Sequence, residues 1–66
     1  MTNTEFRKWR RSQEITQQEV GFAVGVSKSC ICRWEKGNLE IAEPLYLMLM
    51  QYVKNYEEVE NENHYK

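Results

Sequence analysis

The chain has 66 residues and few of the residues that mark special architecture: two cysteines, one proline and three glycines. No apolar run approaches the roughly 18 residues that a membrane-spanning helix needs. Residues 1–5 also lack the basic-then-apolar pattern of a signal peptide. We therefore expect no membrane span and a location in a reducing cytoplasm, where Cys30 and Cys32 stay free thiols.

Patterns typical of metal sites and catalysis are missing as well. Cys30 and Cys32 lie two positions apart on a predicted helix, so their thiols point roughly 200° apart and cannot share one metal ion. The single histidine, His64, has no neighbouring cysteine or histidine. There is no pairing of a nucleophile with a base and no glycine-rich phosphate loop. We expect no metal, no cofactor and no enzymatic activity.

The charge is unevenly distributed along the chain. The formal net charge is −1, but residues 1–56 carry +2 and residues 57–66 carry −3. The excess of acid therefore lies at the C-terminal end, and the rest of the chain is mildly basic. Such a distribution is compatible with an acidic binding partner of the N-terminal part.

The first helix is predicted by a capping box, in which the side chains of Thr2 and Glu5 bond each other's backbone N–H groups. The helix is expected to end near Ser12. No glycine follows it, so Gln13 or Glu14 is expected to carry backbone strain.

Two short helices are expected next. Thr16 begins a second capping box and a helix over residues 17–24, which Gly25 ends. Ser27 caps a third helix that runs to about Lys36. The inward positions of this pair of helices are Val20, Val24, Val26, Ile31 and Trp34.

A fourth helix is expected from Pro44 to about Tyr56. The stripe expected to face the core consists of Leu45, Met48, Leu49, Tyr52, Val53 and Tyr56. Because this helix is apolar on nearly all faces, one side is left for a partner subunit. We expect a homodimer with an interface made of Tyr46, Leu47, Met50 and, from the second helix, Phe22. The alternative is a surface helix with an unusually apolar exterior.

The spacing of small residues predicts a helix-turn-helix over residues 17–36. Gly21 lies where the second helix must approach the third closely, and Gly25 lies at the turn between them. The sequence thus predicts an all-α fold, a compact bundle of four or five helices. Residues 1–56 form the helix-turn-helix domain with its dimerisation helix, and residues 57–66 form an acidic flexible tail.

Several motifs resemble the lambda-repressor/Cro-like (XRE) helix-turn-helix family over about residues 4–53. They are Thr16-Gln17-Gln18-Glu19-Val20-Gly21, Gly25-Val26-Ser27 and Arg33-Trp34-Glu35-Lys36-Gly37-Asn38. The later segment with Ile41 and Pro44-Leu45 is most similar to short proteins of prophages and mobile elements, including antitoxins and anti-CRISPR-associated autorepressors. Two positions depart from the family pattern: Glu14 replaces the usual glycine, and Phe22 replaces a polar residue.

The exposed face of the third helix carries the side chains expected to read DNA. A helix in the major groove meets a distinct donor and acceptor pattern at each base pair. The predicted base contacts are Lys28, Ser29, Cys32 and Arg33. Arg33 can grip a guanine with two hydrogen bonds, although a phosphate contact is the alternative. Cys32 can touch a thymine methyl group, but a partly buried filler is the more ordinary role.

The remaining roles concern the DNA backbone and the fold. The predicted phosphate contacts are Gln17, Ser27, Lys36 and Asn38, and the resemblance implies this role for Gln17. It also implies a partly buried ion pair between Arg10 and Glu35 that ties the first helix to the end of the third.

These observations predict a homodimeric, sequence-specific regulator of double-stranded DNA that binds a palindromic operator. The resemblance implies repression of a phage or mobile-element operon in a bacterial host cell, where the protein would lie on the nucleoid. The alternative is a protein-interaction module, such as a phage-encoded inhibitor or an antitoxin that binds a host protein. Two features support this alternative: the weak net charge, and Phe22 at a position where the family usually has a polar residue.

Overall fold

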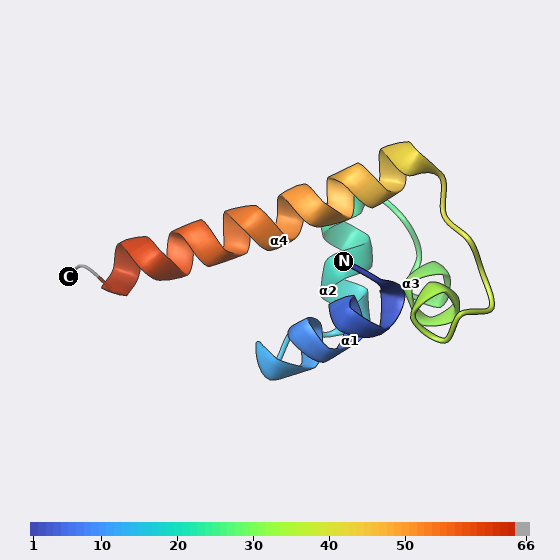
Figure 1. Cartoon of the computed structure of the whole chain (residues 1–66), viewed down its shortest axis with the longest axis horizontal. Coiled ribbons are helices and arrows are strands. Elements are labelled where there is room, and N and C mark those ends of the chain that lie inside the picture. The colour runs from blue at the N-terminus through green and yellow to red at the C-terminus, as the bar shows by residue number, and fades with distance from the viewer. Residues whose placement is uncertain (65–66) are drawn as a thin grey trace.

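Four helices make up the described part of the chain (Figure 1). The structure is a computed structural model that describes the backbone of residues 1–64 and the side chains of residues 1–58. The helices are α1 (Asn3–Ser12), α2 (Gln17–Val24), α3 (Lys28–Glu35) and α4 (Glu43–His64). Within residues 1–64 there is no strand and no fifth helix, and no helix has the length and apolar character needed to cross a membrane. The predicted all-α class is confirmed.

The predicted helix starts are confirmed by their hydrogen bonds. The backbone N–H of Glu5 donates to Thr2 Oγ1 over 3.1 Å, and the Thr2 N–H donates to Glu5 Oε1 over 2.7 Å. Hydrogen bonds from the backbone and the side chain of Thr2 lower the pKa of Glu5. Thr16 and Glu19 form the second capping box at the start of α2. Local sequence therefore fixes where both helices begin.

The turns that follow the helices use positive φ angles where the sequence predicts them. Glu14, in the turn after α1, has a φ of 58°, which places the expected strain on this residue. Gly25 ends α2 with a φ of 80°, and Gly37 follows α3 with a φ of 82°. Glycine meets this demand at no steric cost, whereas Glu14 does not.

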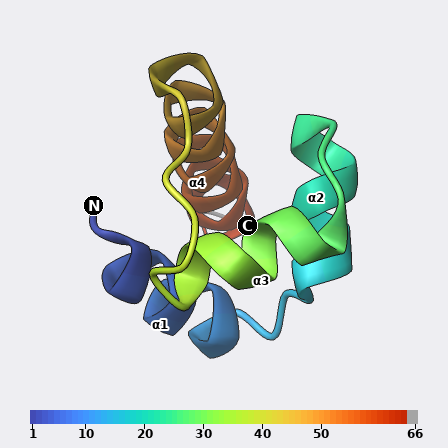
Figure 2. The same ribbon diagram turned by 90° about the vertical axis from the view of Figure 1, so that its right-hand side faces the viewer.

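Eight apolar side chains form the buried core between the four helices. They are Phe6, Ile15, Val20, Val24, Ile31, Trp34, Leu49 and Val53. The Phe6 and Trp34 rings pack with their centroids 5.1 Å apart and join α1 to α3. Figure 2 shows α3 lying between α1 and α2, with α4 behind them.

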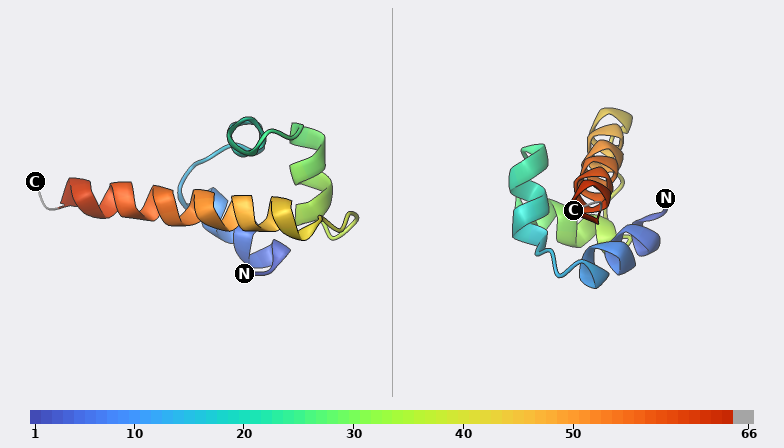
Figure 3. Two further views of the ribbon diagram at one scale, coloured as in Figure 1. Left: turned by 90° about the horizontal axis from the view of Figure 1, so that it is seen from above. Right: turned by 90° about the vertical axis from the view of Figure 1, so that its left-hand side faces the viewer.

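The predicted end of α4 near Tyr56 is wrong, because the helix continues to His64. Figures 1 and 3 show its last turns extending beyond the other three helices, and the molecule measures 41 × 21 × 20 Å. Glutamate is a good helix former, so an acidic segment can continue a helix that packing has started. The predicted flexible tail is thus helical over residues 57–64, and residues 65–66 lie outside the described residues.

The predicted core stripe of α4 is correct only in part. Leu49 and Val53 are buried, but Met48 is 49% exposed. Tyr46 and Met50, expected on the free side, are partly buried against the core. A helix that is apolar all round carries no periodic signal that selects the buried side, so only the packing of the other helices decides it.

Candidate nucleic-acid interface

One side of α3 is exposed, and it carries the side chains predicted to read bases. Lys28, Ser29 and Arg33 are exposed, and Cys32 is partly buried. These four residues line a shared surface hollow of about 330 Å³. The opposite side of α3, made of Ile31, Trp34 and Glu35, is buried. The predicted division of α3 into an inner and an outer side is confirmed, and contact with bases stays a prediction.

Close packing between α2 and the turn that follows it places α3. A Cβ atom on Gly21 would lie only 2.6 Å from the backbone oxygen of Val26, which no side chain permits. The N–H of Val26 donates to the carbonyl oxygen of Gly21 over 2.9 Å. Gly21 is thus a point of close approach as predicted, but the backbone that it meets belongs to Val26 and Ser27 of the turn and not to α3 itself. This contact fixes the direction in which α3 leaves the turn.

The two ends of α3 hold three of the predicted phosphate contacts. Ser27 is exposed, and its Oγ accepts the backbone N–H of Cys30 over 3.1 Å as the helix cap. Lys36 and Asn38 are exposed just beyond the other end. The Asn38 N–H donates to the carbonyl oxygen of Arg33 over 2.9 Å, which keeps this segment close to the helix.

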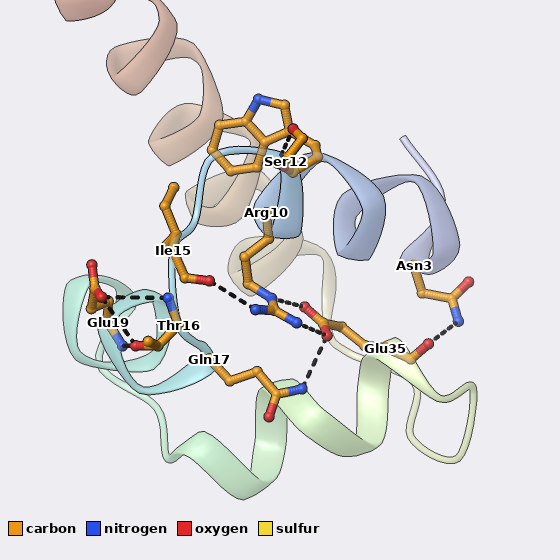
Figure 4. A network of polar contacts seen from close by, with 9 residues as sticks. Asn3, Arg10, Ser12, Ile15, Thr16, Gln17, Glu19 and Glu35 are labelled. Atoms are coloured by element: carbon orange, nitrogen blue, oxygen red, sulfur yellow. Dashed lines mark hydrogen bonds and ion pairs between the residues drawn. The ribbon is translucent and has the colours of Figure 1, made fainter.

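A buried ion pair connects α1 to the end of α3 (Figure 4). Arg10 Nε donates to Glu35 Oε2 over 2.8 Å, and Arg10 Nη2 donates to Oε1 over 2.9 Å. A third bond runs from Arg10 Nη1 to the carbonyl oxygen of Ile15 over 2.8 Å. Arg10 is 8% exposed and Glu35 is 4% exposed. The pair expected from the family resemblance is present, and its forked geometry resists rotation of α3 against α1.

Gln17 belongs to the same network. Its Nε2 donates to Glu35 Oε1 over 3.0 Å, so the amide of this predicted phosphate contact points towards α3 (Figure 4). The side chain is partly buried. Gln17 therefore ties the start of α2 to the end of α3, and its amide group can meet a phosphate only by leaving or sharing this bond.

Asn3 has a role at the end of α3 that was not predicted from the sequence. Its Nδ2 donates to the carbonyl oxygens of Trp34 and Glu35 over 3.1 and 3.2 Å. The last carbonyls of a helix lack donors within the helix, and here the Trp34 oxygen also accepts the N–H of Gly37 over 2.9 Å. Asn3 therefore holds the last turn of α3 from the start of α1. An asparagine in a first helical turn is common, and nothing in the sequence points to so distant a partner.

The predicted dimer residues fall into two groups. Phe22 is 90% exposed and Leu47 is 57% exposed, so both are accessible to a partner. Tyr46 and Met50 pack against the core instead. The Tyr46 hydroxyl also donates to the carbonyl oxygen of Met1 over 2.9 Å. Of the four predicted residues, therefore, only Phe22 and Leu47 present an exposed side chain to a partner subunit.

Cys30 and Cys32 are free thiols, both partly buried. Within the described residues, no group of three or more His, Cys, Asp or Glu side chains is placed to hold a metal ion.

Comparisons of the chain with protein-family models, with curated proteins and with solved structures gave no match. A functional interpretation must therefore come from the residues themselves, that is, from the exposed side of α3 and the basic groups near it.

Proposed function

We propose that this protein is a sequence-specific, double-stranded DNA-binding regulator in which α2 and α3 form a helix-turn-helix. The observation that carries the proposal is the exposed side of α3, where Lys28, Ser29 and Arg33 project together. α3 enters the major groove with this side facing the base edges. Arg33 forms two hydrogen bonds with a guanine, and Lys28 reaches the same acceptors as a point charge.

Rigidity supports this role of α3. A side chain can distinguish bases only if its own helix is held in a fixed orientation. Here Ile31 and Trp34 anchor α3 in the core, and Glu35 is held by Arg10 through two hydrogen bonds. The last turn is held by Asn3. α3 is thus held at several points, so the side chains on its exposed side start from a backbone of fixed orientation.

The regulator acts as a homodimer on a palindromic operator. Two copies of α3 then enter major grooves about 34 Å apart, which is one turn of DNA. Exposed Phe22 and Leu47 supply apolar surface for the contact between subunits. Binding across a promoter excludes the polymerase, so the proposed regulator is a repressor, and its own operon is the proposed target.

Binding-site selection with the purified protein tests the proposal. We expect one enriched palindrome, with affinity that falls steeply as salt rises. Arg33→Ala should weaken binding to this site by about 1–3 kcal/mol and relax the preference at one base pair. Lys54→Ala removes an exposed positive charge from α4 and is the matched control. If the variant keeps the full base preference, Arg33 does not read a base.

A protein-binding role is the second candidate, and the 90% exposure of Phe22 favours it. In that case the protein should enrich no DNA sequence, and a host protein should co-purify with it. Phe22→Ser should abolish that co-purification while the fold remains intact. Enrichment of a palindrome with no protein partner would dismiss this candidate.

A further inference from the structure

A second hollow, of about 560 Å³, lies where the end of α1, the start of α2 and the end of α3 meet. Three exposed cationic side chains line it: Arg7 and Arg11 from α1, and Lys36 from the end of α3. Gln17 lies at the same place. The hollow is therefore formed by segments that are far apart in the sequence and adjoins the exposed side of α3.

The charges around this hollow do not cancel. Arg10 also lines it, but this guanidinium is paired with Glu35. Among the described side chains, Arg10 and Glu35 form the single ion pair. The charges of Arg7, Arg11 and Lys36 are therefore not neutralised by an ion pair within the described part of the protein and can interact with an external partner. Glu14 is the exposed acid at the hollow, which leaves a local excess of two positive charges.

We propose that Arg7 and Arg11, together with Lys36, bind the DNA phosphates that flank the base pairs contacted by α3. This inference rests on the proposed function and extends the interface from the helix-turn-helix onto α1. Arg7 and Arg11 are four residues apart, so their side chains leave the same side of α1 about 6 Å from each other. Lys36 follows Arg33 by three residues, so it lies between the hollow and the exposed side of α3.

The position of the site favours phosphates over bases, because none of its lining residues belongs to the set on the exposed side of α3 that is proposed to read bases. The hollow lies between three helix ends, beside α3, and its exposed donors are two guanidinium groups and an ammonium group. Such groups bind phosphate oxygens of any sequence. Lys8 is the natural contrast: it is also exposed on α1, but it does not line the hollow and its charge acts on Glu5.

The test compares the double variant Arg7→Ala/Arg11→Ala with Lys8→Ala on the palindrome selected by the wild type and on a scrambled duplex. Each lost phosphate contact lowers the slope of log affinity against log salt by about 0.9. The double variant should therefore lose about 1.8 from the slope. The ratio of wild-type affinity to double-variant affinity should therefore fall about tenfold when salt is raised from 50 to 200 mM. Both duplexes should be affected equally, and Lys8→Ala should keep the wild-type slope.

A variant that strengthens binding guards against a loss caused by unfolding. Glu14→Gln removes the acid at the hollow and should raise affinity about threefold at 50 mM salt. Glu58→Gln removes an exposed acid from the far end of α4 and should leave affinity unchanged.

The outcomes separate this inference from the function on which it rests. If the wild type binds its palindrome and the double variant keeps the wild-type salt slope, the α1 contact is refuted while DNA binding stands. A loss limited to the selected palindrome would also overturn it, because it would indicate base reading. If the wild type binds no duplex, the proposed function and the α1 contact both fall.

Discussion

The buried pair of Arg10 and Glu35 is the residue-scale feature on which the position of α3 depends most. Losing one partner of a buried pair leaves an unpaired charge in the core and costs about 3–5 kcal/mol. We expect Glu35→Ala to lower the free energy of unfolding by this amount, which is much of the stability of a domain this small. Urea unfolding followed by circular dichroism measures it.

The double variant Arg10→Met/Glu35→Leu is the control for this prediction. It removes both charges and should recover part of the stability lost in Glu35→Ala. Full recovery is not expected, because the Ile15 carbonyl oxygen also loses its bond from Arg10. A cost below about 1 kcal/mol for Glu35→Ala would mean that the pair behaves like an exposed one.

Gly21 within α2 and Gly25 at its C-terminal cap allow a paired test of close packing against backbone conformation. Gly21→Ala would place a Cβ atom 2.6 Å from the Val26 oxygen, so the turn before α3 must move. We expect a loss of roughly 2 kcal/mol or more. At Gly25 nothing lies within 4 Å of an added Cβ atom, but φ is 80°, so Gly25→Ala should cost only about 1 kcal/mol. Thermal unfolding of both variants compares the two, and equal losses would contradict the packing argument.

Most helix boundaries could be predicted from the sequence because they depend on neighbouring residues. The caps at Thr2, Thr16 and Ser27 involve groups within three residues. The role of Asn3 and the burial of Ile15 could not be predicted, because both depend on segments distant in the sequence. The exposed side of α3 could be predicted in part. Helical periodicity predicts which residues of α3 share a side, but it does not predict which other segments surround that side.

At the scale of the element, α4 is where sequence reasoning was weakest and where the proposed dimer is most open to test. Leu49 is fully buried, so Leu49→Glu should unfold the chain rather than merely separate subunits. Leu47 is 57% exposed, so Leu47→Glu should leave the helix content unchanged. Under the proposed homodimer it should convert the dimer to a monomer, because it places a charge in an apolar contact.

Sedimentation equilibrium and circular dichroism distinguish these results. Thr4→Glu adds the same charge at an exposed position of α1 and is expected to remain dimeric. If Leu47→Glu and the wild type sediment alike as dimers, the interface lies elsewhere on the molecule. If the wild type is itself a monomer, the homodimer is wrong, and the exposed side of α4 needs another explanation.

At the scale of the whole molecule, the long α4 separates charges of opposite sign. Figures 1 and 3 place α3 at the same end of the molecule as the start of α4, and the acidic residues 57–62 towards the other end. At 1.5 Å per residue, Glu57 is about 21 Å along the helix from Glu43. The Debye length is about 8 Å at 0.15 M salt. Under the proposed function, the acidic end is therefore screened from DNA at α3, even though it makes the net charge of the protein negative.

This separation predicts how the four glutamates of residues 57–62 affect DNA binding. Replacing all four with glutamine should change the affinity for the selected palindrome by less than about twofold at 150 mM salt. At 10 mM salt, where the Debye length is about 30 Å, the same replacement should tighten binding by roughly threefold or more. Fluorescence anisotropy at the two salt concentrations measures both values. A tenfold gain at 150 mM would instead place the acidic end against the DNA, because only a charge within a screening length of the phosphates repels them so strongly in that buffer.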